Sequence, residues 1–290
     1  MRIHRLITPK VIAISIIVIA ILSGITLYGL YIFDPKQATR PISHFPKSIA
    51  VVGDSISVGF NTRQTNQATL ANNWATGTSS EVNSIAARIA KERSIATLPS
   101  TNVAKPGAES NDLSNQVRKV AVKNPDAVLV LIGANDICTS GGQTNGMTSV
   151  TLFQSRIRES LRAIDGQTDI FVGSVVNMQN LLDIGAADSD VQAVWAKANI
   201  CKVMLTRPSS TAPEDIVRRE AVNVRVADYN KVLKDECEQL RNCTYDQGAT
   251  FKIAFNKSDV SPTDYFHPSI NGQAKLAEAF LPVIQQKYQL

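Results

Sequence analysis

The stretch that decides the fold is Ile49-Ala50-Val51-Val52-Gly53-Asp54-Ser55, an apolar run that ends in a glycine and two polar residues. Ala127-Val128-Leu129-Val130-Leu131-Ile132 repeats the pattern and is followed by Gly133. Runs that are apolar at every position are typical of strands in a parallel sheet that is covered on both faces. Such sheets bind ligands at the carboxyl ends of their strands, so the residues after each run are candidates for a site.

Further strands and helices alternate along the chain. Strands are expected at Asp169–Val176 and Phe251–Phe255, with a short one before Pro106-Gly107, whereas Asn177–Thr211 is expected to be an irregular loop. This order predicts an α/β fold of three layers, α/β/α, around a five-stranded, mostly parallel sheet, with residues 49–290 as one domain. The expected helices lie around Glu81–Arg93, Leu113–Val122, Leu152–Ile164 and Pro213–Leu240, and in a last helix with Leu276, Phe280 and Ile284.

The N-terminal region differs from the rest of the chain. Val11–Phe33 has 23 residues without a charge, and a helix of that length covers the ~30 Å hydrocarbon core of a bilayer. Arg2, Arg5 and Lys10 precede this run, so the positive-inside rule predicts that residues 1–10 are cytoplasmic and that the domain lies outside. We therefore expect a cell-membrane protein that crosses the bilayer once. The alternative is a long signal peptide, whose removal would leave a secreted protein.

The charge of the chain is concentrated before the predicted domain. Residues 34–48 contain three prolines and are expected to be an extended linker. Residues 1–48 carry six basic side chains and one acidic side chain, whereas the rest of the chain carries 24 of each. A domain without net charge has no overall attraction for nucleic acid, so that class of partner is set aside.

The four cysteines lie in the part that is expected outside the cytoplasm, where disulfides persist. Four cysteines allow three pairings, and free buried thiols are the alternative. We expect Cys237–Cys243, which would close a short loop at a helix end, and Cys138–Cys201, which would tie the loop beside Asn135 to the segment Asn177–Thr211. Because none of the cysteines has CxxC spacing, a zinc ribbon is not expected.

His267 is the single histidine of the predicted domain, which excludes a metal centre built from several histidines. Asp264 precedes it by three residues, and in a tight turn the carboxylate can accept the Nδ1 proton and leave Nε2 free to take a proton from a hydroxyl. Ser55, directly after an apolar strand, supplies such a hydroxyl at the sheet edge. The alternative is a surface histidine and a turn-capping aspartate.

Two more residues follow predicted strands and can stabilise negative charge. Gly107 can bring its backbone N–H close to a ligand, because glycine has no side chain. Asn135, in Gly133-Ala134-Asn135-Asp136, offers a neutral amide donor that suits a developing oxyanion. Either residue could instead serve only in a turn.

Four blocks in this order resemble the SGNH/GDSL hydrolases: Gly53-Asp54-Ser55, Gly107, Gly133-Ala134-Asn135-Asp136 and Asp264-Tyr265-Phe266-His267. They spread over nearly the whole predicted domain. The resemblance implies a flavodoxin-like fold and a carboxylic ester hydrolase that needs no metal or organic cofactor. It also implies that Ser55 is the nucleophile, that Asp264 and His267 complete the triad, and that Asn135 and the N–H groups of Ser55 and Gly107 form the oxyanion hole. The serine block of this chain is GDSI (Gly53–Ile56) rather than GDSL, which is a mild departure from the family pattern.

A finer resemblance is to the phospholipase B-like branch, through Asn73-Trp74-Ala75-Thr76-Gly77, the block Asn102–Ala108 and the block Ile132–Cys138. It does not fix the substrate, because the family covers lipids, short esters and acetylated sugars. We expect a lipid, lysophospholipid or small acyl ester, with carbohydrate de-O-acetylation as the alternative. Two classes compete with an esterase: a non-catalytic module that binds glycan or lipid, and a structural envelope protein. An assay with a chromogenic acetate ester separates both of them from an esterase.

Overall fold

Five parallel strands form one sheet in the part of the chain that this computed structural model describes, residues 45–63, 66–138 and 141–288. The strands pair in the order β2-β1-β3-β4-β5, and each of the four pairings is parallel, as predicted. The bounds are β1 Ile49–Gly53, β2 Ser100–Asn102, β3 Ala127–Leu131, β4 Asp169–Val172 and β5 Cys243–Tyr245.

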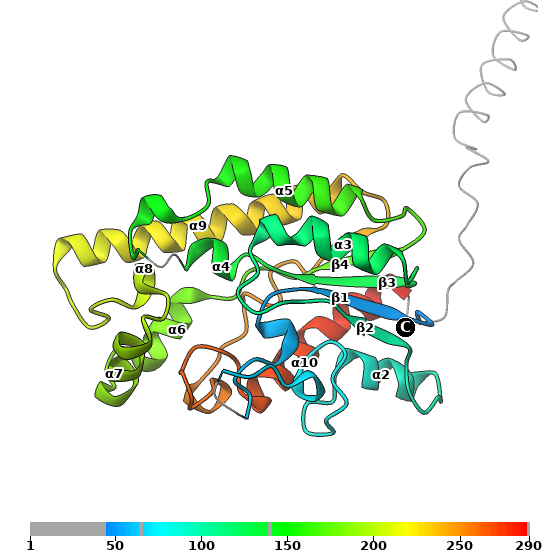
Figure 1. Ribbon diagram of the computed structural model, residues 1–290, viewed down its shortest axis with the longest axis horizontal. Coiled ribbons are helices and arrows are strands. Elements are labelled where there is room, and N and C mark those ends of the chain that lie inside the picture. Colours follow the sequence, from blue (N-terminus) through cyan, green and yellow to red (C-terminus); the bar gives the residue numbers. More distant parts are fainter. Residues whose placement is uncertain (1–44, 64–65, 139–140, 289–290) are drawn as a thin grey trace, which may run out of the picture. The chain divides into compact units, whose positions relative to one another are not determined.

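Helices cover both faces of this sheet (Figure 1). On one face lie α3 (Leu113–Ala121), α5 (Val150–Arg162) and α9 (Pro213–Glu238). On the other face lie α2 (Ile85–Glu92) and α10 (Ile270–Tyr288). All five helices lie close to where periodicity predicted them, and the predicted three-layer α/β/α fold is confirmed.

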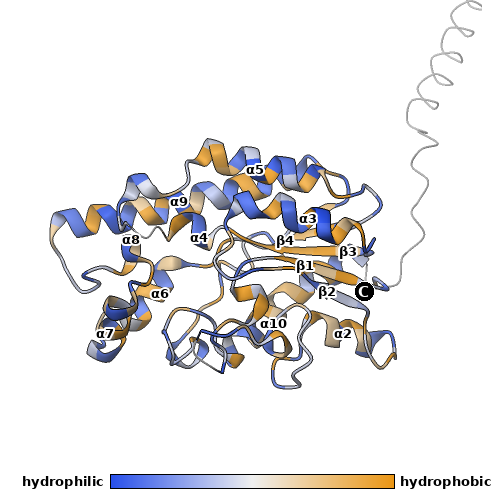
Figure 2. Ribbon diagram, viewed as in Figure 1, coloured by the Kyte–Doolittle hydropathy of each residue, from blue (hydrophilic) through white to orange (hydrophobic). Residues whose placement is uncertain are grey.

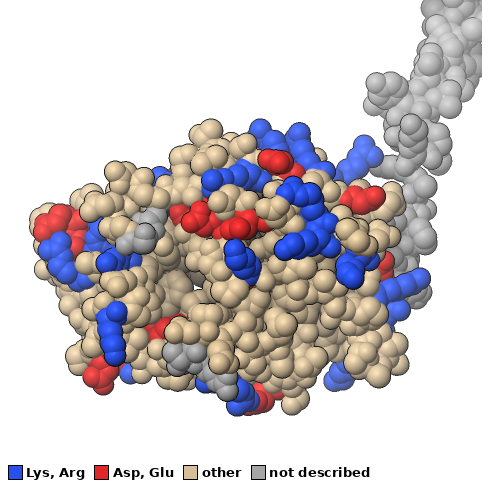
Figure 3. Space-filling view, viewed as in Figure 1, with Lys and Arg blue, Asp and Glu red and all other residues tan. Residues whose placement is uncertain are grey.

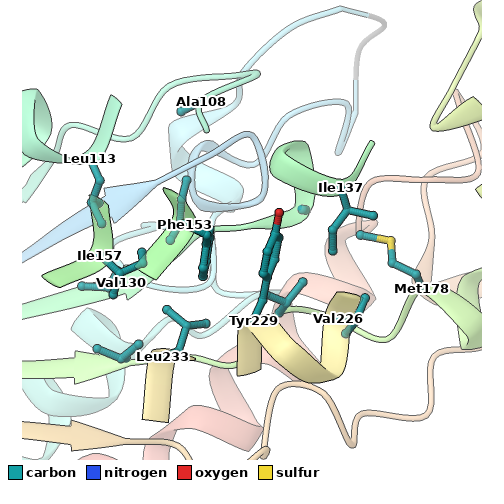
Figure 4. Close-up of a cluster of buried hydrophobic side chains, with 14 of the residues drawn as sticks. Ala108, Leu113, Val130, Ile137, Phe153, Ile157, Met178, Val226, Tyr229 and Leu233 are labelled. Carbon is teal, nitrogen blue, oxygen red and sulfur yellow. The ribbon is translucent and has the colours of Figure 1, made fainter. Parts of the chain in front are cut away.

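Each face of the sheet has its own hydrophobic core, because successive strand residues point to opposite sides. Val52 packs in the cluster beneath α3, α5 and α9, whereas its neighbour Val51 packs in the cluster against α2 and α10. Figure 2 shows the mostly apolar strands between helices that carry both polar and apolar residues. Figure 4 shows part of the first cluster, where the rings of Phe153 and Tyr229 stack with their centroids 3.9 Å apart.

The segment Asn177–Thr211 contains three helices, so the predicted irregular loop is wrong. The first two begin at side-chain caps: Asn177 accepts hydrogen bonds from two backbone N–H groups of α6, and Asp188 does the same for α7. Two breaks of three residues each interrupt the apolar pattern of this segment, so no long periodic run marks it in the sequence. The bounds of the helices are α6 Met178–Gly185, α7 Ser189–Ala198 and α8 Lys202–Leu205.

The prediction of a strand at Phe251–Phe255 is also wrong. The fifth strand is β5, which starts eight residues earlier, at Cys243. The reason lies in Asp246, directly after β5, whose carboxylate accepts hydrogen bonds from the N–H groups of Gly248 and Thr250. These bonds fold the chain into turns, so the apolar residues that follow cannot extend along β4. Three residues with a cysteine among them gave β5 too weak a signal to be predicted.

Several short elements complete the described fold. The helix α4 starts directly after Gly133, and five single 3₁₀ turns occur in loops. The bounds are α4 Ala134–Ile137, η1 Ile56–Val58, η2 Leu70–Asn72, η3 Ser110–Asp112, η4 Thr144–Gly146 and η5 Lys257–Asp259.

Both expected disulfides are present. Cys138–Cys201 joins the end of α4 to the start of α8 across 63 residues of sequence. Cys237–Cys243 joins the end of α9 to the start of β5, with a separation of 6 residues. Charged side chains of both signs are mixed on the visible surface (Figure 3), which fits the equal numbers of acidic and basic residues after position 48.

The expected membrane span, Val11–Phe33, lies outside the described residues. Within residues 45–63, 66–138 and 141–288, no helix combines the length and apolarity needed to cross a bilayer. The first described residue, Phe45, is buried and lies with its ring centroid 6.4 Å from that of Tyr288 at the end of α10. The last residues before β1 therefore pack on the domain.

Candidate active site

The serine turn, residues Gly53–Gly59, begins where β1 ends. Gly53 has φ 144°, and a Cβ there would lie 2.1 Å from the carbonyl oxygen of Leu131 on β3, so no other residue fits. Gln116 on α3 holds the same residue, because its side chain accepts from Gly53 N at 2.6 Å and donates to Gly53 O at 2.9 Å. Ser55 is therefore fixed at the carboxyl edge of the sheet, where η1 starts.

The histidine turn, residues Ser261–Pro268, precedes α10 and closes on itself. Ser261 N donates to His267 O at 2.8 Å, and Tyr265 N donates to Ser261 O at 2.7 Å. Tyr265 takes up φ 50°, a left-handed conformation that reverses the chain between Asp264 and His267. The turn therefore presents the carboxylate and the imidazole on the same side.

The two turns meet at three side chains. Ser55 Oγ lies 2.8 Å from His267 Nε2, and His267 Nδ1 lies 2.6 Å from Asp264 Oδ2. In such a chain the imidazole can take the hydroxyl proton while the carboxylate fixes its tautomer. The structure thus brings together three of the predicted site residues, across 212 positions of sequence between serine and histidine.

Asp264 is held as an ionised acceptor. Its Oδ2 also accepts from Asn61 Nδ2 at 2.5 Å, and its Oδ1 accepts from the backbone N–H groups of Phe266 and His267 at 2.9 and 3.0 Å. Burial raises the pKa of Asp264, but the hydrogen bonds from His267 and Asn61 outweigh it and leave the pKa below its ordinary value. The carboxylate is therefore charged where an imidazolium would form.

Asn61 is a site residue that the sequence did not reveal. It lies six positions after Ser55, is 4 % exposed, and reaches Asp264 directly. Nothing in the sequence around it distinguishes this amide from a turn asparagine. Its contact with Asp264 depends on how the loop after Gly59 folds back, which a linear pattern does not report.

Gly107 and Asn135 follow β2 and β3, the two strands that flank β1 in the sheet. Asn135 Nδ2 donates to Ala108 O at 2.9 Å, and an amide nitrogen carries a second hydrogen for another acceptor. Gly107 is exposed with φ 74°, and a Cβ there would meet open space. Lys105 N donates to Gly53 O at 3.1 Å, which attaches this loop to the start of the serine turn. Neither predicted donor is hydrogen-bonded to Ser55.

Two more buried carboxylates flank the serine. Burial raises the pKa of Asp54 to about 7, although Ile56 N donates to it at 2.9 Å. Burial also raises the pKa of Asp136, although Ser110 donates to it from both its backbone N–H and its hydroxyl, at 2.8 and 2.6 Å. Within the described ranges, no three His, Cys, Asp or Glu side chains form a cluster that could hold a metal ion.

The segment α6–α8 touches both halves of the site. Trp195 on α7 donates from Nε1 to Tyr265 O, at 3.1 Å, in the middle of the histidine turn. Cys201 at the start of α8 is bonded to Cys138, three residues after Asn135. Because these links are buried or covalent, the segment holds the histidine turn and α4 at a fixed separation.

Comparison with known families identifies the class of protein. The family profile described as GDSL-like Lipase/Acylhydrolase matches residues 49–280, which is most of the chain. The chain belongs to this family, the SGNH/GDSL hydrolases, and is a carboxylic ester hydrolase. The finer resemblance to the phospholipase B-like branch stays a prediction.

Solved structures share the fold at low sequence identity. LAE5, an alpha/beta hydrolase from the metagenome of Lake Arreo, Spain, is 15% identical over 82% of this chain and 94% of its own, with a TM-score of 0.51. The lipase/acylhydrolase from Enterococcus faecalis is 16% identical over 83% and 96%, with a TM-score of 0.50. The acetyl xylan esterase AlAXEase is 13% identical over 80% and 96%, also with a TM-score of 0.50. No curated protein matches the chain significantly.

Proposed function

We propose that this protein hydrolyses carboxylic esters through an acyl-enzyme formed on Ser55. The observation that carries the proposal is the continuous hydrogen-bonded chain from Ser55 Oγ through His267 to Asp264, with distances of 2.8 and 2.6 Å. Ser55 Oγ attacks the ester carbonyl carbon as its proton passes to His267 Nε2. Asp264 keeps the imidazole oriented and stabilises the imidazolium that results.

The oxyanion of the tetrahedral intermediate would rest on Asn135 Nδ2 and on the backbone N–H groups of Ser55 and Gly107. In the described part of the chain neither of these backbone N–H groups donates to a protein acceptor. When the intermediate collapses, the carbon–oxygen bond of the ester breaks and His267 returns the proton to the departing alcohol. Water then repeats the attack, with His267 as base, and releases the acid from Ser55.

Aromatic side chains beside the imidazole favour an ester with an apolar acyl group. The rings of Phe60 and Phe266 lie against His267, with centroids 5.0 and 5.1 Å away, and both are half-buried. A lipid, lysophospholipid or small acyl ester suits such walls. Acetylated carbohydrate is the competing substrate class, since one protein of the same fold is an acetyl xylan esterase.

The test uses purified protein with intact disulfides. We expect hydrolysis of chromogenic esters, with rates compared along an acyl-chain series and against an acetylated polysaccharide. A fluorophosphonate should label Ser55, and labelling should fall in His267→Ala. Wild-type protein that hydrolyses no ester and takes up no fluorophosphonate would falsify the catalytic proposal and favour a binding module.

We further propose that the domain lies outside the cytoplasm and is anchored by Val11–Phe33. The support is the uncharged length of that run, the basic residues before it, and two disulfides of the kind that persist in oxidising compartments. The full chain should stay with membranes through a carbonate wash. A mature N-terminus between about 30 and 45 would instead indicate a cleaved signal peptide.

A further inference from the structure

We propose that Asn61 is a positioning residue, which holds the Asp264 carboxylate against His267 and thereby selects the imidazole tautomer that faces Ser55. This inference rests on the proposed function of the Ser55, His267 and Asp264 side chains. Nothing about the family match assigns a role to Asn61.

The first step of the argument is that the orientation of the Asn61 amide is fixed. Its Oδ1 accepts a hydrogen bond from the backbone N–H of Asn66, at 2.6 Å. A backbone N–H can only donate, so this end of the amide must be the oxygen and the other end must be the NH₂ group. That NH₂ group is the one that lies 2.5 Å from Asp264 Oδ2.

The second step is that one oxygen of Asp264 serves two donors. Oδ2 accepts from Asn61 Nδ2 and from His267 Nδ1, at 2.5 and 2.6 Å. Asn61 Nδ2 and the backbone N–H groups of Phe266 and His267 all donate to this carboxylate, which favours its ionised form, and the pKa of Asp264 is lowered accordingly. An ionised carboxylate only accepts, so the bond to His267 uses the hydrogen on Nδ1. A neutral imidazole with its hydrogen on Nδ1 has its lone pair on Nε2, which faces Ser55 Oγ at 2.8 Å.

The third step is that Asn61 is itself held rigidly. It has φ 58°, which asparagine tolerates better than most residues, and it is 4 % exposed. Asn61 N donates to Gln67 O at 2.9 Å, and Asn61 O accepts from Ser261 Oγ at 2.6 Å. One residue therefore joins the loop after the serine turn to the first residue of the histidine turn.

The electrostatic setting of Asp264 is simple enough for a pH test. The hydrogen bonds from His267 and then from Asn61 lower the pKa of Asp264 against the effect of burial. Losing the Asn61 donor should raise that pKa, so the carboxylate would gain a proton at a higher pH. Other titratable groups near the two turns include Asp54, which interacts with His267 and Asp136. Beside the histidine turn, Lys257 lies over the Tyr265 ring and pairs with Asp188, and Asp259 pairs with Lys275.

Two variants test the idea without straining the backbone. Asn61→Gly removes the amide and tolerates φ 58°, whereas Asn61→Asp keeps the shape but replaces the donor by an acceptor. Asn83→Asp is the matched control, because Asn83 also has a positive φ, of 49°, and is exposed two residues before α2, with no hydrogen bond to either site turn among the described residues. Unfolding curves of all three variants show whether the fold is retained.

We expect Asn61→Gly and Asn61→Asp to lower kcat about 10- to 100-fold, as loss of outer partners does at metal-bound histidines, and Asn83→Asp to leave it unchanged. The acid limb of the kcat–pH profile should move to higher pH in Asn61→Gly. In an Asp264→Asn background the Asn61 substitutions should cost almost nothing further, because the group through which they act is gone.

A second readout needs no turnover. The Nδ1 proton between His267 and Asp264 should give a low-field proton NMR signal, and Asn61→Gly should shift or broaden it while Asn83→Asp does not. Folded Asn61 variants with wild-type kcat, an unmoved acid limb and an unmoved signal would overturn this inference and leave the proposed function standing. An inactive wild-type protein would overturn the proposed function instead, and the NMR comparison would still decide the role of Asn61.

Discussion

Asp54 and Asp264 are two carboxylates beside the same serine and histidine, and their surroundings drive their ionisation in opposite directions. Asp54 is 1 % exposed, and burial raises its pKa to about 7 although Ile56 N donates a hydrogen bond to its carboxylate. Asp264 is 6 % exposed and accepts four hydrogen bonds, so its pKa is lowered. The pKa values of two buried carboxylates therefore shift in opposite directions, because burial dominates at Asp54 whereas the hydrogen bond and charge of His267 and the Asn61 donor outweigh it at Asp264.

The contrast has a chemical consequence under the proposed mechanism. A charge on Asp264 stabilises the imidazolium that forms during attack. A second charge on Asp54, next to Ser55, would oppose the oxyanion that develops on the other side of the reaction, and below a pH of about 7 Asp54 is mostly neutral. Below that pH the histidine turn therefore carries the negative charge of Asp264, whereas Asp54 in the serine turn is mostly neutral.

The largest expected effect comes from removing either the donor or the acceptor of the proton that passes from Ser55 to His267. Ser55→Ala and His267→Ala should each lower kcat by several orders of magnitude, up to about 10⁶-fold, and the double variant should lose little more. The three kcat values measured side by side check this. Losses that multiply in the double variant would mean that the two turns do not act as one unit.

The second effect compares the two carboxylates directly. Asp264→Asn should lower kcat by about 10⁴-fold, because an amide at this position favours the wrong tautomer of His267. Asp54→Asn should cost far less when kcat is measured below a pH of about 7, since an asparagine oxygen still accepts from Ile56 N and the native side chain is mostly neutral there. If Asp54→Asn proved as damaging as Asp264→Asn, the distinction between them would collapse.

A third and smaller effect is expected at the oxyanion donors. Asn135→Ala should lower kcat by about 10²–10³-fold, as the loss of a single donor does in other enzymes. The bond from Asn135 Nδ2 to Ala108 O is lost as well, so unfolding curves must accompany the kinetics. Fluorophosphonate labelling of Ser55 should persist in this variant, and its disappearance would point to a displaced serine turn.

The smallest effect concerns stability rather than rate. The pKa of Asp54 is about 7 in the folded protein and 3.8 ordinarily, so between these values the folded state keeps a proton that the unfolded state has lost. Stability should therefore fall as pH rises across this window, by at most about 1.4 kcal/mol per pH unit from this group. Asp264, with its lowered pKa, acts in the opposite sense and only at pH values below 3.8.

Asp54→Asn should flatten that slope. Urea unfolding at several pH values between 4 and 7 measures it, with wild-type protein alongside. Part of the slope should remain, because burial also raises the pKa values of Asp136 and Glu109. An unchanged slope would show that Asp54 is ionised in the folded protein throughout this range.

The sequence predicted what depends on periodicity and on order along the chain. The apolar runs located β1 and β3, and the order of glycine, serine, asparagine, aspartate and histidine blocks located the strand ends where the site forms. The pairing of Ser55 with His267 followed from His267 being the single histidine of the predicted domain and from the resemblance to the SGNH/GDSL hydrolases. The prediction of the two disulfides rested on helix ends and loop positions in the same way.

What the sequence could not predict depends on side chains that meet across distant segments. Asn61 and Gln116 support the site through single hydrogen bonds to Asp264 and Gly53, and neither lies in a recognisable pattern. The helices α6–α8 were missed because short breaks separate them and because their caps, Asn177 and Asp188, look like ordinary loop residues in the sequence. The run Phe251–Phe255 was wrongly predicted to be a strand, because a short apolar run that packs in turns has the same sequence pattern as a short strand.

The 212 positions between Ser55 and His267 also determine when activity can begin. At synthesis rates of about 5–20 residues per second, the histidine is added on the order of 10–40 seconds after the serine. Because α10 follows the histidine turn directly, the base is among the last parts of the described fold to be synthesised. Under the proposed mechanism, a chain that is still being synthesised therefore has an unactivated serine and hydrolyses no ester.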